Sequence, residues 1–178
     1  MMSRRTFLQY AAVAGATLAA PAAMAKAVVQ SGERRLSLYN IHTGERLTTP
    51  YWADGVYLED ELTAINRLLR DHRSGEVSSI DYKLLDRLHS LQQQLGHNGS
   101  FQVISGYRSA ASNAKLQRAS NGVAKRSLHM QGRAIDIRLP GVELKHLRQV
   151  ALSQRAGGVG YYQKSNFIHL DTGRTRFW

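Results

Sequence analysis

The sequence contains no cysteine, which excludes disulfide bonds, thiolate zinc ligands and cysteine nucleophiles. The domain must therefore rely on its hydrophobic core for stability. A phosphate-binding loop is also lacking. The glycine-rich run 157–162 has neither the lysine nor the following helix that such a loop requires. We interpret this run as the entry to a strand, where glycines permit close backbone approach.

The apolar, alanine-rich run 11–20 is too short to form a regular transmembrane helix. This run follows the twin-arginine export pattern at residues 3–8 and precedes a small-x-small cleavage site at residues 23–25. We predict a twin-arginine signal peptide at 1–25 and export to the periplasm, with no stable membrane insertion after cleavage. The alternative is an uncleaved N-terminal anchor.

Acidic residues are few, since 13 Asp and Glu stand against 24 Lys and Arg, for a net charge of +11. Arg4 and Arg5 are the only charged residues of the predicted signal, so cleavage would leave +9. Such a surplus often indicates nucleic acid binding, but an exported protein meets little nucleic acid. We expect an anionic cell-wall polymer as the counterpart. Simple solvation of the surface explains the charge about equally well.

The remaining 153 residues suffice for one domain with its own core. We predict a flexible leader at 26–35 and a single domain at 36–178. Period-two alternation of apolar residues predicts strands, and apolar spacing of three and four predicts helices. The expected strands are 36–41, 47–51, 101–106, 134–139, 157–162 and 167–171, and the expected helices are 60–73, 81–95, 109–119 and 143–155.

Two stretches carry the candidate chemistry, Ser127–Ile137 and Phe167–Gly173. In the first, alternation places Asp136 on a polar strand face that looks toward the loop carrying His129. In the second, His169 and Asp171 share a strand face. If the two strands pair, Asp136 and His169 approach each other. A lone His or Asp in a strand is usually structural, but three in this arrangement make a metal-ligand role about as plausible as a structural one.

These motifs resemble a known family. The pattern Ser-x-His-x-x-Gly-x-Ala-x-Asp at 127–136 is similar to the hallmark of the LAS zinc peptidases. The runs Ser105–Ser109 and Phe167–Gly173 support the likeness, which spans residues 36–178. Within the family, the chain most resembles exported murein endopeptidases of the YcbK/MepK type.

The resemblance implies a small α+β fold with an antiparallel sheet of about four strands flanked by helices. It implies one zinc ion per chain, held by His129, Asp136 and His169. It further implies a zinc metallopeptidase that hydrolyses peptide cross-links of peptidoglycan, with the bond between two diaminopimelate residues as the expected target. Ligand type alone does not exclude another divalent metal.

Two further residues receive predicted catalytic roles. Arg108 would stabilise the developing oxyanion or hold a substrate carboxylate, and a surface salt bridge is its alternative. Many relatives carry a general base as a glutamate three residues, or a histidine two residues, before the last zinc histidine. Asn166 and Phe167 occupy those positions here. Asp171 is the replacement candidate for the base, and orientation of His169 is its alternative role.

Two other functional classes stay open on the sequence. The missing family base allows a non-catalytic zinc-containing module that binds peptidoglycan. A basic, metal-free structural protein that coats peptidoglycan or nucleic acid is disfavoured by the intact ligand triad. No heptad pattern or long apolar run indicates assembly, so we expect a monomer.

Overall fold

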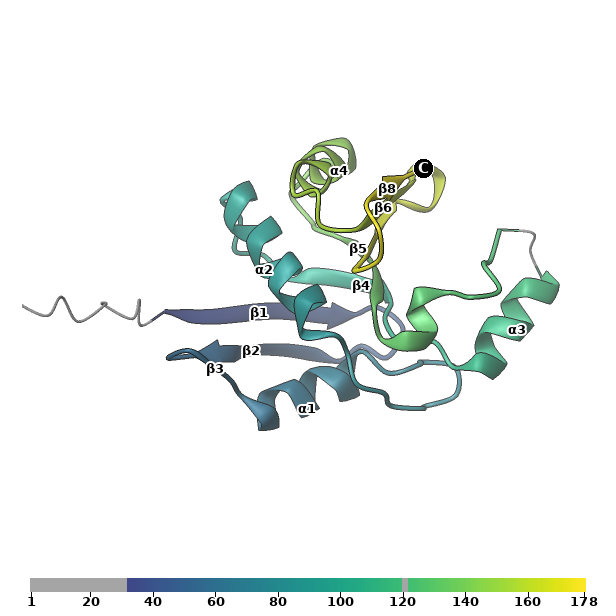
Figure 1. Ribbon diagram of the computed structural model, residues 1–178, viewed down its shortest axis with the longest axis horizontal. Helices are drawn as coiled ribbons and strands as arrows, with labels where there is room; N and C mark the ends of the chain where they lie inside the picture. The colour runs from purple at the N-terminus through teal and green to yellow at the C-terminus, as the bar shows by residue number, and fades with distance from the viewer. Residues whose placement is uncertain (1–31, 120–121) are drawn as a thin grey trace, which may run out of the picture.

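The computed structural model of the chain describes residues 32–119 and 122–178 as an α+β domain built on one sheet. The predicted signal peptide lies outside the described residues, as does most of the predicted leader. Figure 1 shows the sheet with helices around it. Its strands follow the order β3-β2-β1-β4-β5-β7-β6-β8. The strands are β1 (Glu33–Asn40), β2 (Arg46–Ala53), β3 (Val56–Tyr57), β4 (Phe101–Ser105), β5 (Ala134–Arg138), β6 (Gly158–Tyr162), β7 (Phe167–Asp171) and β8 (Arg176–Phe177).

Four α-helices and two short 3₁₀ helices complete the described fold. They are α1 (Glu59–Leu68), α2 (Tyr82–Leu95), α3 (Ala110–Ala119), α4 (Leu144–Ser153), η1 (Leu128–Gln131) and η2 (Gln163–Ser165). Helix α2 has the predicted ends: Asp81 accepts from the Lys83 backbone N–H as N-cap, and Gly96 closes the helix in a left-handed conformation. Among the described residues, we find no helix with the length and apolar character needed to cross a membrane.

The prediction of about four antiparallel strands was wrong, because the sheet has eight strands and mixed pairing. Strand β1 runs parallel to β4, and β6 runs parallel to β8. The N-terminal hairpin of β1 and β2 extends the sheet on one side, with β3 at its edge. Strands β3 and β8 have only two residues each, too few to show an alternating pattern in the sequence.

The boundary of the predicted leader was also wrong, because β1 already begins at Glu33. Residues 33–35 are charged, which hid them from a hydrophobic pattern. Their backbone nevertheless pairs with β2, and the Arg34 guanidinium lies 4.3 Å from the centre of the Trp52 ring. The same guanidinium donates to Asp86 at 2.7 Å. Sheet pairing and these side-chain contacts order the segment.

Helix α1 ends at Leu68, five residues before the predicted end. The reason lies in the carbonyls of its last turn. The Asn40 side-chain amide donates to the Leu68 carbonyl at 2.9 Å, and the Tyr107 backbone N–H donates to the Leu69 carbonyl at 2.8 Å. A longer helix would need those carbonyls for its own hydrogen bonds, so these contacts with other segments oppose its continuation.

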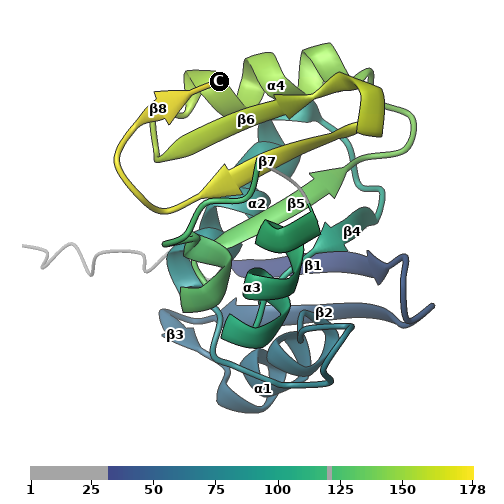
Figure 2. The same ribbon diagram turned by 90° about the vertical axis from the view of Figure 1, so that its right-hand side faces the viewer.

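The two faces of the sheet differ in what covers them. Figure 2 shows α2 and α4 behind the sheet and α3 in front of it. Helices α2 and α4 contribute leucines to the hydrophobic core, and Ile135 and Ile137 of β5 belong to the same core. Because side chains alternate along a strand, Asp136 points to the opposite face. This is the face on which η1 and its histidine lie.

Candidate metal centre

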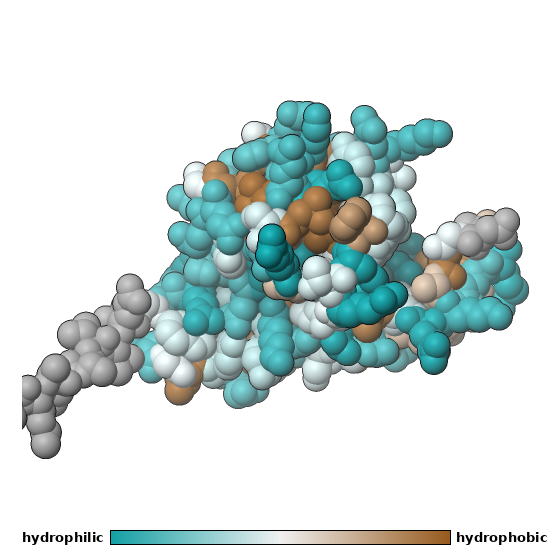
Figure 3. Space-filling model, turned by 45° about the horizontal axis from the view of Figure 1, so that its top comes forward, coloured by the Kyte–Doolittle hydropathy of each residue, from teal (hydrophilic) through white to brown (hydrophobic). Residues whose placement is uncertain are grey.

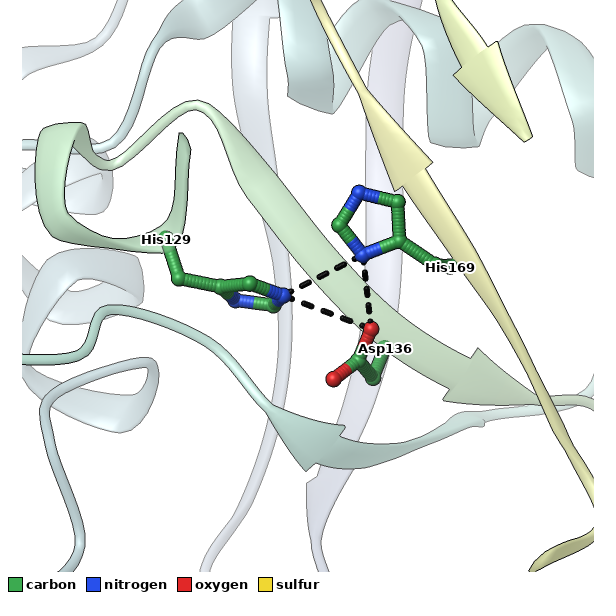
Figure 4. Close-up of side chains that lie close together, drawn as sticks. All are labelled: His129, Asp136 and His169. Atoms are coloured by element: carbon green, nitrogen blue, oxygen red, sulfur yellow. Dashed lines mark hydrogen bonds and ion pairs between the residues drawn. The ribbon is translucent and has the colours of Figure 1, made fainter. Parts of the chain in front are cut away.

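The three predicted ligands lie together, at the place where η1, β5 and β7 meet. Figure 4 shows His129, Asp136 and His169 pointing toward one another from these elements. His129 Nε2 lies 3.2 Å from His169 Nδ1 and 3.3 Å from Asp136 Oδ1. His169 Nδ1 lies 2.9 Å from the same carboxylate oxygen. These distances place the three potential ligand atoms in a compact triangle. All three residues are buried.

Sheet register and one glycine position the triangle. Strands β5 and β7 pair antiparallel, which confirms the predicted approach of Asp136 and His169, and the register places the two residues directly opposite each other. His129 is delivered by η1, which ends at Gly132 with φ of 65°. A side chain at Gly132 would meet the Ser79 carbonyl at less than contact distance. Gly132 therefore allows both the left-handed turn and the close approach of the neighbouring loop.

In each histidine, the ring nitrogen outside the triangle, here called the far nitrogen, makes a hydrogen bond that fixes the orientation of the ring. A backbone carbonyl can only accept, so His129 Nδ1 donates to the Gly106 carbonyl at 2.7 Å. His169 Nε2 donates to Asp171 Oδ2 at 3.0 Å. In neutral imidazoles the remaining nitrogens are then acceptors. When both imidazoles are neutral, two nitrogen lone pairs and one carboxylate oxygen therefore face one another.

The electrostatics agree with a site that requires positive charge. Burial alone would raise the pKa of Asp136, but His129 and His169 lower it well below the usual carboxylate range. Burial lowers the pKa of His169, yet Asp136 and Asp171 together raise it above the ordinary value. A cation among the three atoms, either a proton or a metal ion, relieves the repulsion between their lone pairs.

The donor set fits a zinc ion. Zinc binds imidazole nitrogen and carboxylate oxygen at about 2.0–2.2 Å, which places tetrahedral ligands about 3.3 Å apart. The observed separations of 2.9 to 3.3 Å are close to this value. The far nitrogens of both histidines are hydrogen-bonded, as is usual for histidines that bind a metal. Three protein ligands leave a fourth position for water or substrate.

Asp171 lies behind His169 and has no exposed surface. Its Oδ1 accepts from the backbone N–H groups of Gly158 and Gly173. The Arg176 guanidinium donates to both carboxylate oxygens, at 3.0 and 2.6 Å. Burial would raise the pKa of Asp171, but His169, Arg176 and the backbone donors lower it, so the carboxylate is ionised. Its hydrogen bonds all serve to hold it and His169 in place.

Arg108 lies beside Asp136, where its Nη2 is 3.8 Å from Asp136 Oδ2. The side chain is 12% exposed and also donates to Ser105 and Asn113. Its buried Nε has no hydrogen-bond partner within the described residues. Burial lowers the pKa of Arg108, an effect that Asp136 opposes. Because this guanidinium also lines a cleft beside the triangle, it can bind an oxyanion or a carboxylate there.

A cleft of about 510 Å³ opens over the triangle. Arg108, Arg126, Ser127 and Leu128 contribute to its lining beside the three central residues. Tyr162, Phe167 and Trp178 also line it, and the Tyr162 and Phe167 rings stack 4.6 Å apart. Among the described residues that line the cleft, Asp136 is the sole carboxylate. Asn166 lines a separate hollow with Gln102 and Arg138.

Comparison with known proteins identifies the family. The family model for peptidoglycan L,D-endopeptidase MepK matches residues 28–178. The peptidoglycan L,D-endopeptidase MepK of Escherichia coli K12 is 46% identical over 145 residues, which cover 82% of this chain and 80% of the relative. The chain belongs to the MepK family. A probable MepK of Haemophilus influenzae Rd is 44% identical over 146 residues, covering 82% of this chain and 78% of the relative.

For this member of the MepK family, the sequence offered Asp171 as a possible partner of His169 but missed the other groups that surround the histidines. The Gly106 carbonyl carries no side-chain signal. Arg176 and Trp178 belong to the run Arg-Thr-Arg-Phe-Trp at 174–178, which contains cationic and aromatic side chains. This composition could have suggested a functional role, but nothing local in it indicates that β8 pairs with β6.

Proposed function

We propose that the chain is a zinc-dependent murein endopeptidase that hydrolyses L,D peptide cross-links of peptidoglycan during growth or remodelling of the cell wall. Membership in the MepK family supports the reaction and the substrate class. The observation that supports the metal dependence is the convergence of His129 Nε2, His169 Nδ1 and Asp136 Oδ1 within 3.3 Å of one another, while the other nitrogen of each ring is hydrogen-bonded elsewhere. The bond between two diaminopimelate residues is the proposed target, as the L,D specificity named for these relatives supports.

His129, Asp136 and His169 would hold the zinc ion, one per chain. Zinc in such a site supplies Lewis-acid polarisation of a carbonyl and activation of water at neutral pH. The residues of the chain then position the substrate. The Arg108 guanidinium, which lines the cleft, donates hydrogen bonds to the scissile carbonyl oxygen as negative charge develops there. A substrate carboxylate is the second ligand that the same group can take.

Asp171 acts as an orienting residue in this proposal. Its carboxylate is fully buried and accepts five hydrogen bonds. One of these comes from His169 Nε2, the ring nitrogen that faces away from Asp136. A general base must reach the proton it removes, and Asp171 does not line the cleft. It fixes the tautomer and the direction of His169 instead.

The site of action follows from the proposed signal peptide. We expect the mature chain in the periplasm after twin-arginine export, as a monomer that meets the cross-linked peptides of the wall. No nucleic acid partner is proposed. The surplus of basic residues suits an anionic wall polymer.

A non-catalytic peptidoglycan-binding module is the second candidate. The observation in its favour is that Asp136, itself a proposed ligand, is the sole carboxylate among the described residues of the cleft. The module would bind cross-linked wall in the presence of zinc and leave every peptide bond intact.

One experiment separates the two functions. Purified residues 26–178 are incubated with cross-linked muropeptides, with and without a zinc chelator, and the products are separated by chromatography. Endopeptidase activity converts dimers into monomers, is blocked by the chelator and returns with added zinc. The dimer that disappears identifies the bond. Folded, zinc-loaded protein that binds the wall and leaves all dimers intact would establish the module.

A further inference from the structure

Three aromatic residues line one part of the cleft, and we name Tyr162, Phe167 and Trp178 the aromatic wall. The face of the molecule shown in Figure 3 is largely hydrophilic, with a few hydrophobic patches. The wall lies next to the metal centre: the Trp178 and His169 ring centres are 5.3 Å apart, with a tilt of 47°. Arg108 lies beside Asp136 instead. The indole and the guanidinium thus flank different ligands of the proposed metal.

The indole of Trp178 is held in place although 47% of the residue is exposed. The Trp178 backbone N–H donates to the Val159 carbonyl, and its carbonyl accepts from the Tyr161 N–H, so β8 continues beside β6. The indole N–H donates to the Tyr162 hydroxyl at 2.9 Å. Tyr162 in turn stacks on Phe167. Several contacts thus fix a large ring in an exposed position, which packing for stability alone would not require.

A glycine beneath the ring makes this position possible. Gly160 pairs with His169 in the register of β6 and β7, so it is the sheet neighbour of that histidine. A Cβ atom at Gly160 would lie 2.7 Å from the indole Cε2. The absence of a side chain lets the indole lie directly on the strand, beside the metal centre.

The chemistry of the exposed indole restricts what it can bind. Its N–H group is already used by Tyr162, so the free part of the ring offers only an apolar face. The Arg176 guanidinium, 5.0 Å from the ring centre, is engaged by the Asp171 carboxylate. Aliphatic chains and sugar rings both pack on such a face. Of the two, an aliphatic chain that branches from the peptide at the scissile bond lies near enough to the metal centre.

We infer that the aromatic wall is a specificity subsite in which Trp178 packs against the aliphatic side chain of the substrate residue at the scissile bond. This inference rests on the proposed endopeptidase function. The substrate peptide crosses the metal centre with its reacting carbonyl near Arg108 and a methylene chain, such as that of diaminopimelate, on the indole. Trp178 therefore contributes to substrate binding and leaves metal binding to the three ligands.

The test compares Trp178→Ala with Trp178→Phe, using Phe177→Ala as the matched control. Phe177 is the preceding residue, is 71% exposed and does not line the cleft. The substrates are a diaminopimelate-linked peptide dimer free of glycan and the same dimer carrying its sugars. We expect W178A to raise KM about tenfold, which corresponds to ~1.4 kcal/mol, with little change in kcat. W178F should retain most of the affinity, and F177A should match the wild type.

Two further readouts make the outcome decisive. Zinc content should be one ion per chain in every variant, so loss of zinc from W178A would overturn the inference. An unchanged KM would overturn it too, as would an effect confined to the dimer that carries sugars, which would assign the wall to glycan.

A binding measurement separates failure of the inference from failure of the proposed function. The chain has two tryptophans, so Trp52→Phe leaves Trp178 as the single fluorescent reporter. Titration with the glycan-free dimer should shift its emission, and W178A should bind that dimer about tenfold more weakly by calorimetry. If the wild type cleaves no dimer, but the emission of Trp178 shifts and W178A binds more weakly, the subsite stands and the endopeptidase proposal falls. If the wild type cleaves the dimer and neither effect is seen, the endopeptidase proposal stands and the subsite falls.

Discussion

Two carboxylates of the fold, Asp86 on helix α2 and Asp136 on strand β5, show how a structural cluster differs from a candidate metal site. Asp86 of α2 accepts from Arg34 and from the hydroxyls of Tyr51 and Tyr57, at 2.7 to 3.0 Å. Every one of these partners is a donor, so the cluster is complete within the fold. Asp136 instead faces two ring nitrogens whose protons are directed elsewhere. A cluster of acceptors is complete only when a cation joins it.

The largest expected effect comes from breaking the acceptor cluster. Asp136→Ala removes one ligand and the charge that attracts the cation, so we expect loss of bound zinc and a fall in kcat/KM of about 10³-fold or more. Metal analysis and muropeptide digestion measure the two effects. In chelator the variant and the wild type should unfold at similar temperatures. Retention of zinc together with activity would show that the cluster is not the metal site.

Arg108 should give the next largest effect. Arg108→Ala removes the donor aimed at developing negative charge, and we expect kcat to fall about 10²-fold with zinc still bound. Arg108→Lys retains the charge without the planar fork, and should recover only part of the loss. Steady-state kinetics on a purified dimer give both values. Wild-type kcat in the alanine variant would reduce Arg108 to a structural ion pair.

A substitution at Asp171 tests how much the hydrogen bond to His169 contributes to zinc affinity. Asp171→Ala frees the His169 ring, and we expect zinc affinity to fall by about 10- to 100-fold. Activity should then return in part when zinc is added in excess. Competition with a chromophoric chelator measures the affinity. Full zinc occupancy with no turnover at any zinc concentration would instead assign Asp171 the role of general base.

Breaking the donor cluster should affect stability and leave the chemistry unchanged. Asp86→Ala leaves the buried hydroxyl of Tyr51 without an acceptor, and we expect a loss of about 2 kcal/mol in the free energy of unfolding. The ion pair with Arg34 adds little, because both side chains are partly exposed. Urea denaturation measures the loss, and Tyr57→Phe should give a smaller one. Reduced zinc content in Asp86→Ala would contradict the separation of the two clusters.

We expect the smallest effect, a change in the pH dependence of stability, at a second pair of histidines. His42 and His72 stack face to face, with ring centres 3.9 Å apart. Burial lowers the pKa of His72 to about 4, with further lowering by Arg73. The unfolded chain then binds more protons between about pH 4 and pH 6.5, so stability falls as the pH falls through this window. His72→Gln should flatten that part of the stability profile, and zinc content at neutral pH should not change.

The sequence predicted that His129, Asp136 and His169 lie together, because short-range patterns decide much of this geometry. Alternation within β5 and within β7 fixes which residues share a face, and the strands pair with Asp136 opposite His169. Ser127 to Asp136 brings His129 to the same place through one short 3₁₀ helix and a glycine turn. Family likeness then supplied the proposed metal and the substrate class.

The parts that the sequence did not predict depend on contacts between distant segments. The choice between a base and an orienting role for Asp171 stayed open, since its partner Arg176 belongs to a two-residue strand that returns to β6. Trp178 reaches His169 through the same return. The extra strands of the sheet are either short or charged, as at residues 33–35. Pairing with a neighbour, and not an alternating pattern, makes each of them a strand.

The most direct test of the metal centre is a zinc titration of metal-stripped protein, with cleavage of a diaminopimelate-linked dimer followed at each addition. Activity should rise linearly and stop rising at one zinc ion per chain, and Asp136→Ala should stay inactive throughout. Cleavage by protein shown to contain no metal, or activity that rises without a break at one equivalent, would contradict a single zinc site formed by His129, Asp136 and His169.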